Sequence, residues 1–359
     1  MDVNTEAVLT LLQAGLGKDV CLDSVDDWNL VTKFVHQQGV VAIALDGYGQ
    51  MIKSDKKPSE MPSSLKKQWI AAALHFESIF ATQRDIAVKL ARYFSDNGLK
   101  IYVLKGHVVS ECYPAPNHRY SCDMDCFLKS TDGNGDAWER GNVLVERKGY
   151  YVSRGYYKNN SFLIPGLKVE NHRFLTPFRG DRRLTELEKL LQRMLREDAG
   201  NDKMGDSELC RPPVMVSALF LIEHAFSHFL HEGLTLRHIT DWMMYSRKHH
   251  EEIDWVHLQA CIDEFGFRRF FDAYEHVGEY VLGERKYSDL SGPEQRMMDS
   301  VWDGLDLTNS KKGLRRRMDI VRNTLRARWK YRYFSPVSMF VSLCTRTFGY
   351  FFMRQPALK

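Results

Sequence analysis

Residues 121–128 read Ser121-Cys-Asp-Met-Asp-Cys-Phe-Leu128, a short apolar run with two aspartates one residue apart. Alternate side chains of a β-strand point the same way, so a strand here places Asp123 and Asp125 on one face. The opposite face carries Cys122, Met124 and Cys126. Two carboxylates about 6–7 Å apart on an apolar strand repel each other unless a cation lies between them. The run therefore predicts a strand that binds a divalent metal ion.

A second buried strand is predicted at Ile101-Tyr-Val-Leu104, and Gly106 follows it at the start of a helix that reaches Cys112. A strand, a glycine and a helix N-terminus in this order favour a bound phosphate, because unpaired N–H groups and the helix dipole attract anions. The arrangement is common, so it does not identify a function by itself.

A third carboxylate belongs to a strand predicted at Leu167 to Phe174. Alternation places Lys168, Glu170 and His172 on one face of this strand and Val169 on the other. Glu170 therefore points away from the apolar side. His172 is expected to act as a hydrogen-bonding partner rather than as a metal ligand.

Most of the remaining chain predicts helices, including a long amphipathic one from Ser63 to Asn97 that stops at Gly98. Shorter elements are predicted in the middle, namely a helix from Ala137 to Lys148 and strands at Tyr150–Val152 and Ser161–Ile164. The fold class is thus α+β and predominantly helical. We expect four regions: N-terminal helices (1–98), an α/β core (99–200), a helical domain (201–290) after a polar break at Asp198–Pro213, and a basic helical C-terminal region (291–359).

The net charge of +4 is small but segregated along the 359 residues. Residues 311–359 hold thirteen Lys or Arg and one acid, Asp319, which leaves −8 for the rest. Seven cysteines without paired zinc-type spacing fit buried thiols in a reducing compartment, with Cys122 and Cys126 expected in a core. We find no signal peptide and no uninterrupted apolar run long enough to span a membrane, which predicts a cytoplasmic protein.

Several motifs occur in a fixed order: Leu104-Lys-Gly106, Tyr113-Pro-x-Pro-x-x-Arg119, Asp123-x-Asp125, Glu170-x-His172, Leu221-Ile-Glu-His224 with His228, Leu236-Arg-His-Ile-Thr-Asp241 and Ile253-Asp-Trp255. Together they resemble the uncharacterised nucleotidyltransferase-like family of the DNA polymerase β superfamily. The resemblance covers roughly Ser63 to Gly283. The serine phosphate contact of the wider superfamily is missing, since Lys105-Gly106 stands where that superfamily has a Gly-Gly or Gly-Ser pair.

The resemblance implies a small mixed β-sheet of the nucleotidyltransferase type with flanking helices, followed by a helical domain that helps to bind substrates. It implies transfer of a nucleoside monophosphate from an NTP to a hydroxyl of an unidentified acceptor, supported by two Mg²⁺ ions. The implied catalytic and metal-binding residues are Asp123, Asp125 and Glu170. Nucleotide binding falls to Lys105, Gly106, Arg119 and Arg237, and substrate binding to His172, His224, His228 and Asp241.

Three alternatives stay open. His224, His228 and His231 have a helical spacing that can bind zinc, but no carboxylate completes an established zinc motif. Arg237 and Asp241 are spaced for an ion pair within one helix, or else Asp241 orients Arg237 or His238 beside a triphosphate. The chain could also be a degenerate nucleotide-binding scaffold, because aromatic and basic residues alternate in 311–359 and suit nucleic acid or an anionic membrane surface.

Overall fold

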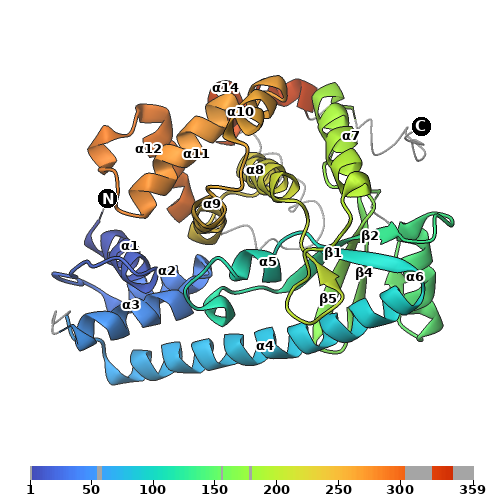
Figure 1. Ribbon diagram of the computed structural model, residues 1–359. Helices are drawn as coiled ribbons and strands as arrows, with labels where there is room; N and C mark the ends of the chain where they lie inside the picture. The colour runs from blue at the N-terminus through green and yellow to red at the C-terminus, as the bar shows by residue number, and fades with distance from the viewer. Residues whose placement is uncertain (1, 55–58, 155–156, 178–179, 304–325, 343–359) are drawn as a thin grey trace, which may run out of the picture.

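The structure is a computed structural model that describes residues 2–54, 59–154, 157–177, 180–303 and 326–342. Helices dominate, and one six-stranded mixed β-sheet lies to one side of the molecule (Figure 1). The α+β class and the mixed sheet are thus confirmed.

The N-terminal region consists of α1 (Val3–Gly15), α2 (Trp28–Gln37), α3 (Val41–Lys53) and α4 (Ser63–Asp96). The side chains of Asp2 and Asp27 accept backbone N–H groups at the starts of α1 and α2. At 34 residues, α4 is about 51 Å long. It runs beneath both the N-terminal helices and the sheet (Figure 1), and it ends at Asp96, two residues before Gly98, whose φ of 72° favours glycine.

The strands are β1 (Leu99–Val103), β2 (Asp123–Ser130), β3 (Val152–Ser153), β4 (Asn159–Ile164), β5 (Leu167–His172) and β6 (Leu209–Cys210). Their order in the sheet is β3-β4-β5-β2-β1-β6. The β2 strand pairs antiparallel with β1 and parallel with β5. The two strands predicted to carry acids are therefore direct neighbours.

The two faces of the sheet have different partners. Met124, Cys126 and Val169 point into an apolar cluster formed with α4 and with α6 (Ala137–Arg147). Side chains of the opposite face, including Asp125 and His172, line a cavity whose other wall is α8 (Val214–His231). The alternation in the sequence thus separated the packed face from the acidic face correctly.

The sheet extends further along the chain than we expected. Strand β6 pairs parallel with β1, with Ile101 opposite Leu209. It lies inside the polar segment 198–213, which the sequence placed between the α/β core and the helical domain. Two buried residues are too short to show periodicity, so only the pairing with β1 reveals them. The division into four regions otherwise stays a prediction.

The second half of the chain is helical: α7 (Arg182–Glu197), α8, α9 (Leu236–Lys248), α10 (Trp255–Glu264), α11 (Arg268–Val281), α12 (Gly292–Asp303) and α14 (Arg328–Phe334). Short turns of helix also occur at α5 (His107–Ser110), η1 (Pro116–His118) and η2 (Tyr287–Asp289). Within the described ranges, α8 alone has the length and apolarity of a membrane span, but 72% of it is buried, as in the core helix of a globular fold.

Two expectations about particular segments need comment. Cys122 is exposed rather than buried, because β2 begins at Asp123 and leaves Cys122 outside the strand. In the basic C-terminal region, Tyr331 and Phe334 of α14 pack into the core, and Lys330 Nζ donates to the carbonyl oxygen of Phe229 at 2.7 Å. Most of the predicted surface-binding segment, including Arg315–Arg317 and Arg322, lies outside the described residues.

His118 joins the N-terminal helices to the motif segment between β1 and β2. Its Nδ1 lies 2.6 Å from Asp46 Oδ2 on α3, and its Nε2 lies 2.8 Å from Glu77 Oε1 on α4. The hydrogen bond to Asp46 raises the pKa of His118 to about 9, against the opposing effect of burial and with the support of Glu77. The imidazolium therefore bridges two carboxylates from two helices.

This bridge predicts a pH-dependent stability. The folded pKa of about 9 exceeds the unfolded value of about 6.5, so the bridge stabilises fully below pH 6.5 and is lost as the pH rises through 9. Because both carboxylates are partly exposed, we expect a contribution of about 1–2 kcal/mol to the free energy of unfolding. Chemical denaturation of wild type and His118→Gln at pH 6 and pH 10 measures it. A difference between the two proteins that does not shrink with rising pH would contradict the bridge.

Candidate functional site

The acidic residues come together because β2 and β5 are paired in register. Asp125 lies opposite Glu170, and Asp123 lies opposite Lys168. In a parallel pair, residues in register point to the same face, so all three carboxylates share the face that looks toward α8. The structure thus brings Asp123, Asp125 and Glu170 to one place.

Asp125 is the most enclosed of the three acids, with a residue exposure of 3%. His172 Nε2 lies 2.8 Å from its Oδ1, and Lys105 Nζ lies 3.2 Å from its Oδ2. Burial alone would raise the pKa of Asp125, but the charge of Lys105 and the hydrogen bond from His172 outweigh burial and hold the pKa well below its usual range. Asp125 is therefore a carboxylate at neutral pH.

Glu170 and Asp123 share one cation. Lys168 Nζ lies 2.6 Å from Glu170 Oε1 and 3.6 Å from Asp123 Oδ2, and Asn159 Nδ2 donates to Glu170 Oε2 at 2.6 Å. The hydrogen bond to Glu170 raises the pKa of Lys168 above its usual value, against the opposing effect of burial and with the support of Asp123. Lys168 and Lys105 thus supply the positive charge that three adjacent carboxylates require.

The residues present fit a divalent metal ion. Ligand atoms of Asp125, Glu170 and His172 lie within 4.8 Å of one another. The buried Asp125 Oδ2 accepts no hydrogen bond of normal geometry from the described residues and has only the ion pair with Lys105. Carboxylate oxygens are the preferred ligands of Mg²⁺. The compact group contains His172 where the sequence predicted Asp123, so the exact ligand set stays a prediction.

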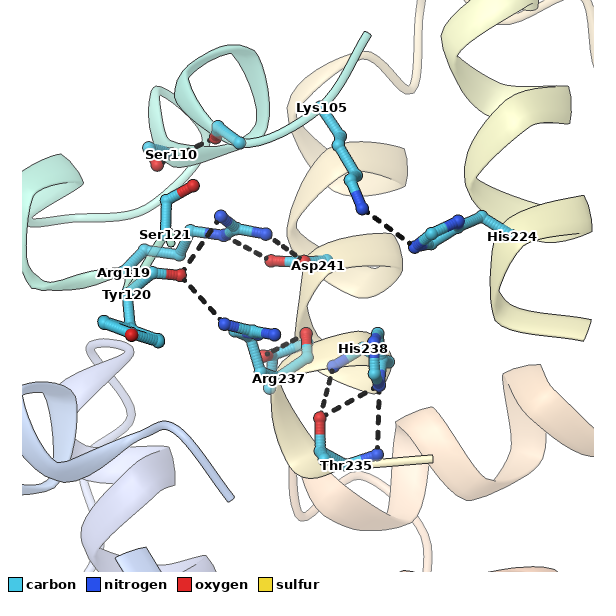
Figure 2. Close-up of polar contacts among 12 residues, drawn as sticks. Lys105, Ser110, Arg119, Tyr120, Ser121, His224, Thr235, Arg237, His238 and Asp241 are labelled. Atoms are coloured by element: carbon cyan, nitrogen blue, oxygen red, sulfur yellow. Dashed lines mark hydrogen bonds and ion pairs between the residues drawn. The ribbon is translucent and has the colours of Figure 1, made fainter. Parts of the chain in front are cut away.

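Arg119 and Asp241 bind each other (Figure 2). The Arg119 guanidinium donates to Asp241 Oδ1 at 2.9 Å and to Oδ2 at 2.5 Å, and Tyr113 Oη donates to Oδ1 at 2.7 Å. Burial favours the neutral guanidine, but Asp241 outweighs it, and the pKa of Arg119 lies above its usual value. The sequence predicted Arg119 as a phosphate contact and Asp241 as a substrate contact. In the structure Arg119 and Asp241 pair with each other. Their roles in binding phosphate and substrate stay predictions.

Arg237 does not pair with Asp241, although the two are four residues apart on α9. Its Nη1 donates to the carbonyl oxygen of Tyr120 at 3.2 Å, and its guanidinium lies 5.6 Å from the centre of the Tyr120 ring. Arg119 donates to the same carbonyl oxygen (Figure 2). Of the two alternatives left open by the sequence, the structure excludes the ion pair within the helix, because Asp241 is turned toward Arg119. In the described part of the chain, Arg237 has no carboxylate within ion-pair distance and is available to bind an anion.

Three histidines of the helical half lie side by side near Lys105. One nitrogen each of His224, His228 and His238 lies within 4.8 Å of the others. The backbone N–H of Thr235 donates to His238 Nδ1 at 3.1 Å, and Lys105 Nζ donates to His224 Nε2 at 3.1 Å (Figure 2). Burial, and next the neighbouring cations, hold the pKa values of His224 and His238 well below 6.5, so both rings are neutral.

These hydrogen bonds decide which nitrogens carry protons. A neutral imidazole binds a metal through its one lone pair, and that lone pair accepts a hydrogen bond in both His224 and His238. The remaining nitrogens, His224 Nδ1 and His238 Nε2, therefore carry protons. The predicted zinc alternative also named His231, whose Nδ1 instead faces the carbonyl oxygen of Ser227 at 2.7 Å. The trio suits the binding of an anion better than that of zinc.

All predicted site residues line one of two adjoining cavities. The small one, of about 40 Å³, is lined by the four predicted nucleotide-binding residues and Asp241. The large one, of about 670 Å³, is lined by Asp125, Glu170, His172 and His228, among others. Lys105, Asp123 and His224 line both cavities. The acids of β2 and β5 and the basic residues of α8 and α9 therefore border one continuous space.

Two contributors to the site were missed as functional residues by sequence reasoning. Lys168 was placed on the acidic face but given no role, although a lysine two residues before Glu170 on one strand face is a readable signal. His238 was named only as a partner of Asp241. The sequence signal for His238 is Thr235, three residues earlier. A Ser or Thr at this position marks the start of a helix, and here Thr235 and His238 hydrogen bond to each other at the start of α9.

One comparison with known proteins found a match. A family model described as an uncharacterised nucleotidyltransferase matches residues 24–283, well over half of the chain. The match begins before the range suggested by the motifs and includes the N-terminal helices α2 and α3. No curated protein and no solved structure matches.

The pairing of Arg119 with Asp241 predicts a structural phenotype. Asp241→Asn leaves the buried guanidinium without a counter-charge, so we expect the free energy of unfolding to fall by about 3 kcal/mol or more. Arg237→Gln is the matched control and should change it by less than about 1 kcal/mol, since only one carbonyl contact is lost. Urea denaturation measures both. Wild-type stability of the Asp241→Asn variant, together with lost NTP binding, would instead make Asp241 a substrate contact.

Proposed function

The chain belongs to the uncharacterised nucleotidyltransferase family, and from this premise we propose that it transfers a nucleoside monophosphate from an NTP to a hydroxyl group in the presence of Mg²⁺. The observation that carries the proposal is the common space between the acids and the cations. Asp123 and Lys105 line both cavities, so a triphosphate held by the cations would place its α-phosphate near the carboxylates.

Nucleotidyl transfer requires a positive surface for the triphosphate. Lys105, Arg119 and Arg237 line the small cavity together with the imidazole of His238. The N–H groups of His238 and His224 add neutral donors. Cations and N–H groups in a partly enclosed site stabilise charge on phosphate oxygens more strongly than they would in water. We propose that this cluster holds the β- and γ-phosphates and then the released pyrophosphate.

The reaction itself exchanges one P–O bond for another. The acceptor oxygen forms a bond to the α-phosphorus, and the bond from that phosphorus to the bridging oxygen of the β-phosphate breaks. Pyrophosphate leaves with the electron pair, and the hydroxyl proton passes to the Glu170 carboxylate and then to solvent. Glu170 is placed for this role because it lies opposite Asp125 on the neighbouring strand and lines the same cavity.

Asp123, Asp125 and Glu170 are the residues that would hold Mg²⁺, with His172 orienting Asp125 through its hydrogen bond. When bound, the ions neutralise charge on the phosphates and favour ionisation of the attacking hydroxyl. Lys105 contacts both Asp125 and His224, so it can turn from the carboxylate toward a phosphate without leaving the site.

Removal of the strand carboxylates tests the reaction. We expect Asp123→Asn and Asp125→Asn each to lower Mg²⁺-dependent transfer from an NTP by a factor of about 100 or more, with circular dichroism unchanged. Calorimetry with NTP and Mg²⁺ and release of pyrophosphate are the measurements, and exposed Asp85→Asn on α4 is the control. Wild-type rates in the double variant Asp123→Asn/Asp125→Asn would end the proposal.

Lys168 offers a separate test of the metal site that needs no acceptor. It neutralises Glu170 and Asp123 in the free protein, so Lys168→Met should strengthen binding of a divalent ion by about two- to fivefold. Electron paramagnetic resonance of Mn²⁺ without nucleotide measures this affinity. Lys189→Met, which removes a surface pair with Glu186, should leave it unchanged. Unaltered or weaker Mn²⁺ binding in Lys168→Met would place the metal elsewhere.

A further inference from the structure

Glu223 lies on α8 directly before His224, but the proposed reaction gives it no task. It lines the large cavity together with Ser227 and Leu230, which follow it on the same face of α8. His224, His228 and His231 form the adjacent face and line the same cavity. The wall that α8 presents to the acidic strands therefore has two stripes, one of imidazoles and one that begins with a carboxyl group.

Among the described residues, one oxygen of the Glu223 carboxyl group is buried without a hydrogen-bond partner. The residue is 1% exposed, and in the described part of the chain its Oε2 has no hydrogen-bond partner. A buried acceptor without a donor costs about 1–3 kcal/mol. Burial raises the pKa of Glu223 to about 7, with Lys158 opposing the shift and Glu188 adding to it. Glu223 thus destabilises the fold and borders a cavity, and a ligand in that cavity that donates a hydrogen bond would remove this cost.

A neighbouring glutamate shows what a structural carboxylate looks like in this fold. Glu188 on α7 is also buried, and it accepts the backbone N–H groups of Leu175 and Thr176, the hydroxyl of Thr176 and the amide of Gln192. All these partners come from the loop after β5 and from α7 itself. Glu188 thus holds that loop in place by hydrogen bonds, whereas Glu223 Oε2 makes no hydrogen bond to any described segment.

Glu223 is close to the acidic strands. Phe220 lies one turn before Glu223 on α8. The centre of the Phe220 ring lies 6.3 Å from the centre of the His172 ring, and His172 in turn hydrogen bonds to Asp125. Lys158 Nζ lies 5.9 Å from the same Phe220 ring. The same cavity is also lined by Ser335, Val337 and Val341, from the far end of the described chain. It contains the acids, whereas Arg119 and Arg237 line only the small cavity.

We propose that Glu223 is the acceptor-binding residue, and that the acceptor is a small polar molecule that donates a hydrogen bond to Oε2 while its hydroxyl faces Asp123, Asp125 and Glu170. The inference rests on the proposed nucleotidyl transfer. A cavity of about 670 Å³ is in the range that encloses a small ligand, and its walls come from α7, α8, the strands β2, β4 and β5, and the C-terminal segment. Glu223 is thus a positioning residue that determines which hydroxyl reaches the α-phosphorus.

The test uses the full chain and NTPs radiolabelled in the α-phosphate, with the small-molecule filtrate of a cell extract as the source of acceptor. We compare wild type, Glu223→Leu, Glu223→Gln and the control Glu188→Leu. For each protein we measure the melting temperature, NTP binding with Mg²⁺ by calorimetry, and label transferred to filtrate compounds. Leucine removes the polar atoms at similar size, and glutamine keeps an accepting oxygen.

We expect Glu223→Leu to bind NTP like wild type, to melt at the same or a higher temperature, and to lose transfer by about tenfold or more. Glu223→Gln should keep transfer if the acceptor donates a neutral hydroxyl and lose it if the donor is an ammonium group, and either result supports the site. Glu188→Leu should lower the melting temperature, because four hydrogen-bond donors lose their acceptor.

Four results would overturn the inference. Wild-type transfer by Glu223→Leu would show that the acceptor does not use this carboxyl, and a fall in its melting temperature like that of Glu188→Leu would make Glu223 structural. Label that enters only macromolecules, with NTP binding intact, would exclude a small acceptor but leave the proposed reaction standing. If wild type binds no NTP with Mg²⁺, the proposed function falls, and the acceptor site falls with it.

Discussion

The buried pair of Arg119 and Asp241 holds the two halves of the site in place. Arg119 ends the motif segment between β1 and β2, and Asp241 lies in the middle of α9 in the helical half. Tyr113 adds a hydrogen bond from the same segment. Two charged groups removed from water tolerate little change in geometry, because either one alone in the interior is costly. The distance between the acidic strands and the histidines of α8 and α9 depends on this pair.

Charge balance explains the rest of the site. Three carboxylates on adjacent strands repel one another, and two lysines lie beside them in the free protein. On the opposite wall, Arg237 and three imidazoles line the two adjoining cavities, and the acids beside them, Asp241 and Glu232, pair with Arg119 and His228. One wall therefore attracts cations and the other attracts anions. The proposed substrate, a nucleoside triphosphate with Mg²⁺, carries both kinds of charge.

The site also contains polar groups that weaken the fold. Among the described residues, Asp125 Oδ2 and Glu223 Oε2 are buried without hydrogen bonds, while Glu188 nearby is fully satisfied. Proteins generally pair such groups, so each exception calls for an explanation, and for these two we propose a bound ligand. The same helix, α8, carries Glu223 and two of the histidines, so one element positions both the proposed anion-binding groups and the proposed acceptor-binding group.

Local pattern was enough to predict much of this protein. Period-two alternation identified the faces of β2 and β5, helical spacing and Gly98 defined α4, and the ordered motifs indicated the family. Other features depend on contacts between distant residues. Strand β6 is too short to have a pattern, Cys122 falls just outside its strand, and Arg119 rather than Arg237 pairs with Asp241. Sequence by itself determined which residues share a face, because backbone geometry repeats every few residues; only the tertiary structure decided which charges meet, because pairing and burial act across the whole chain.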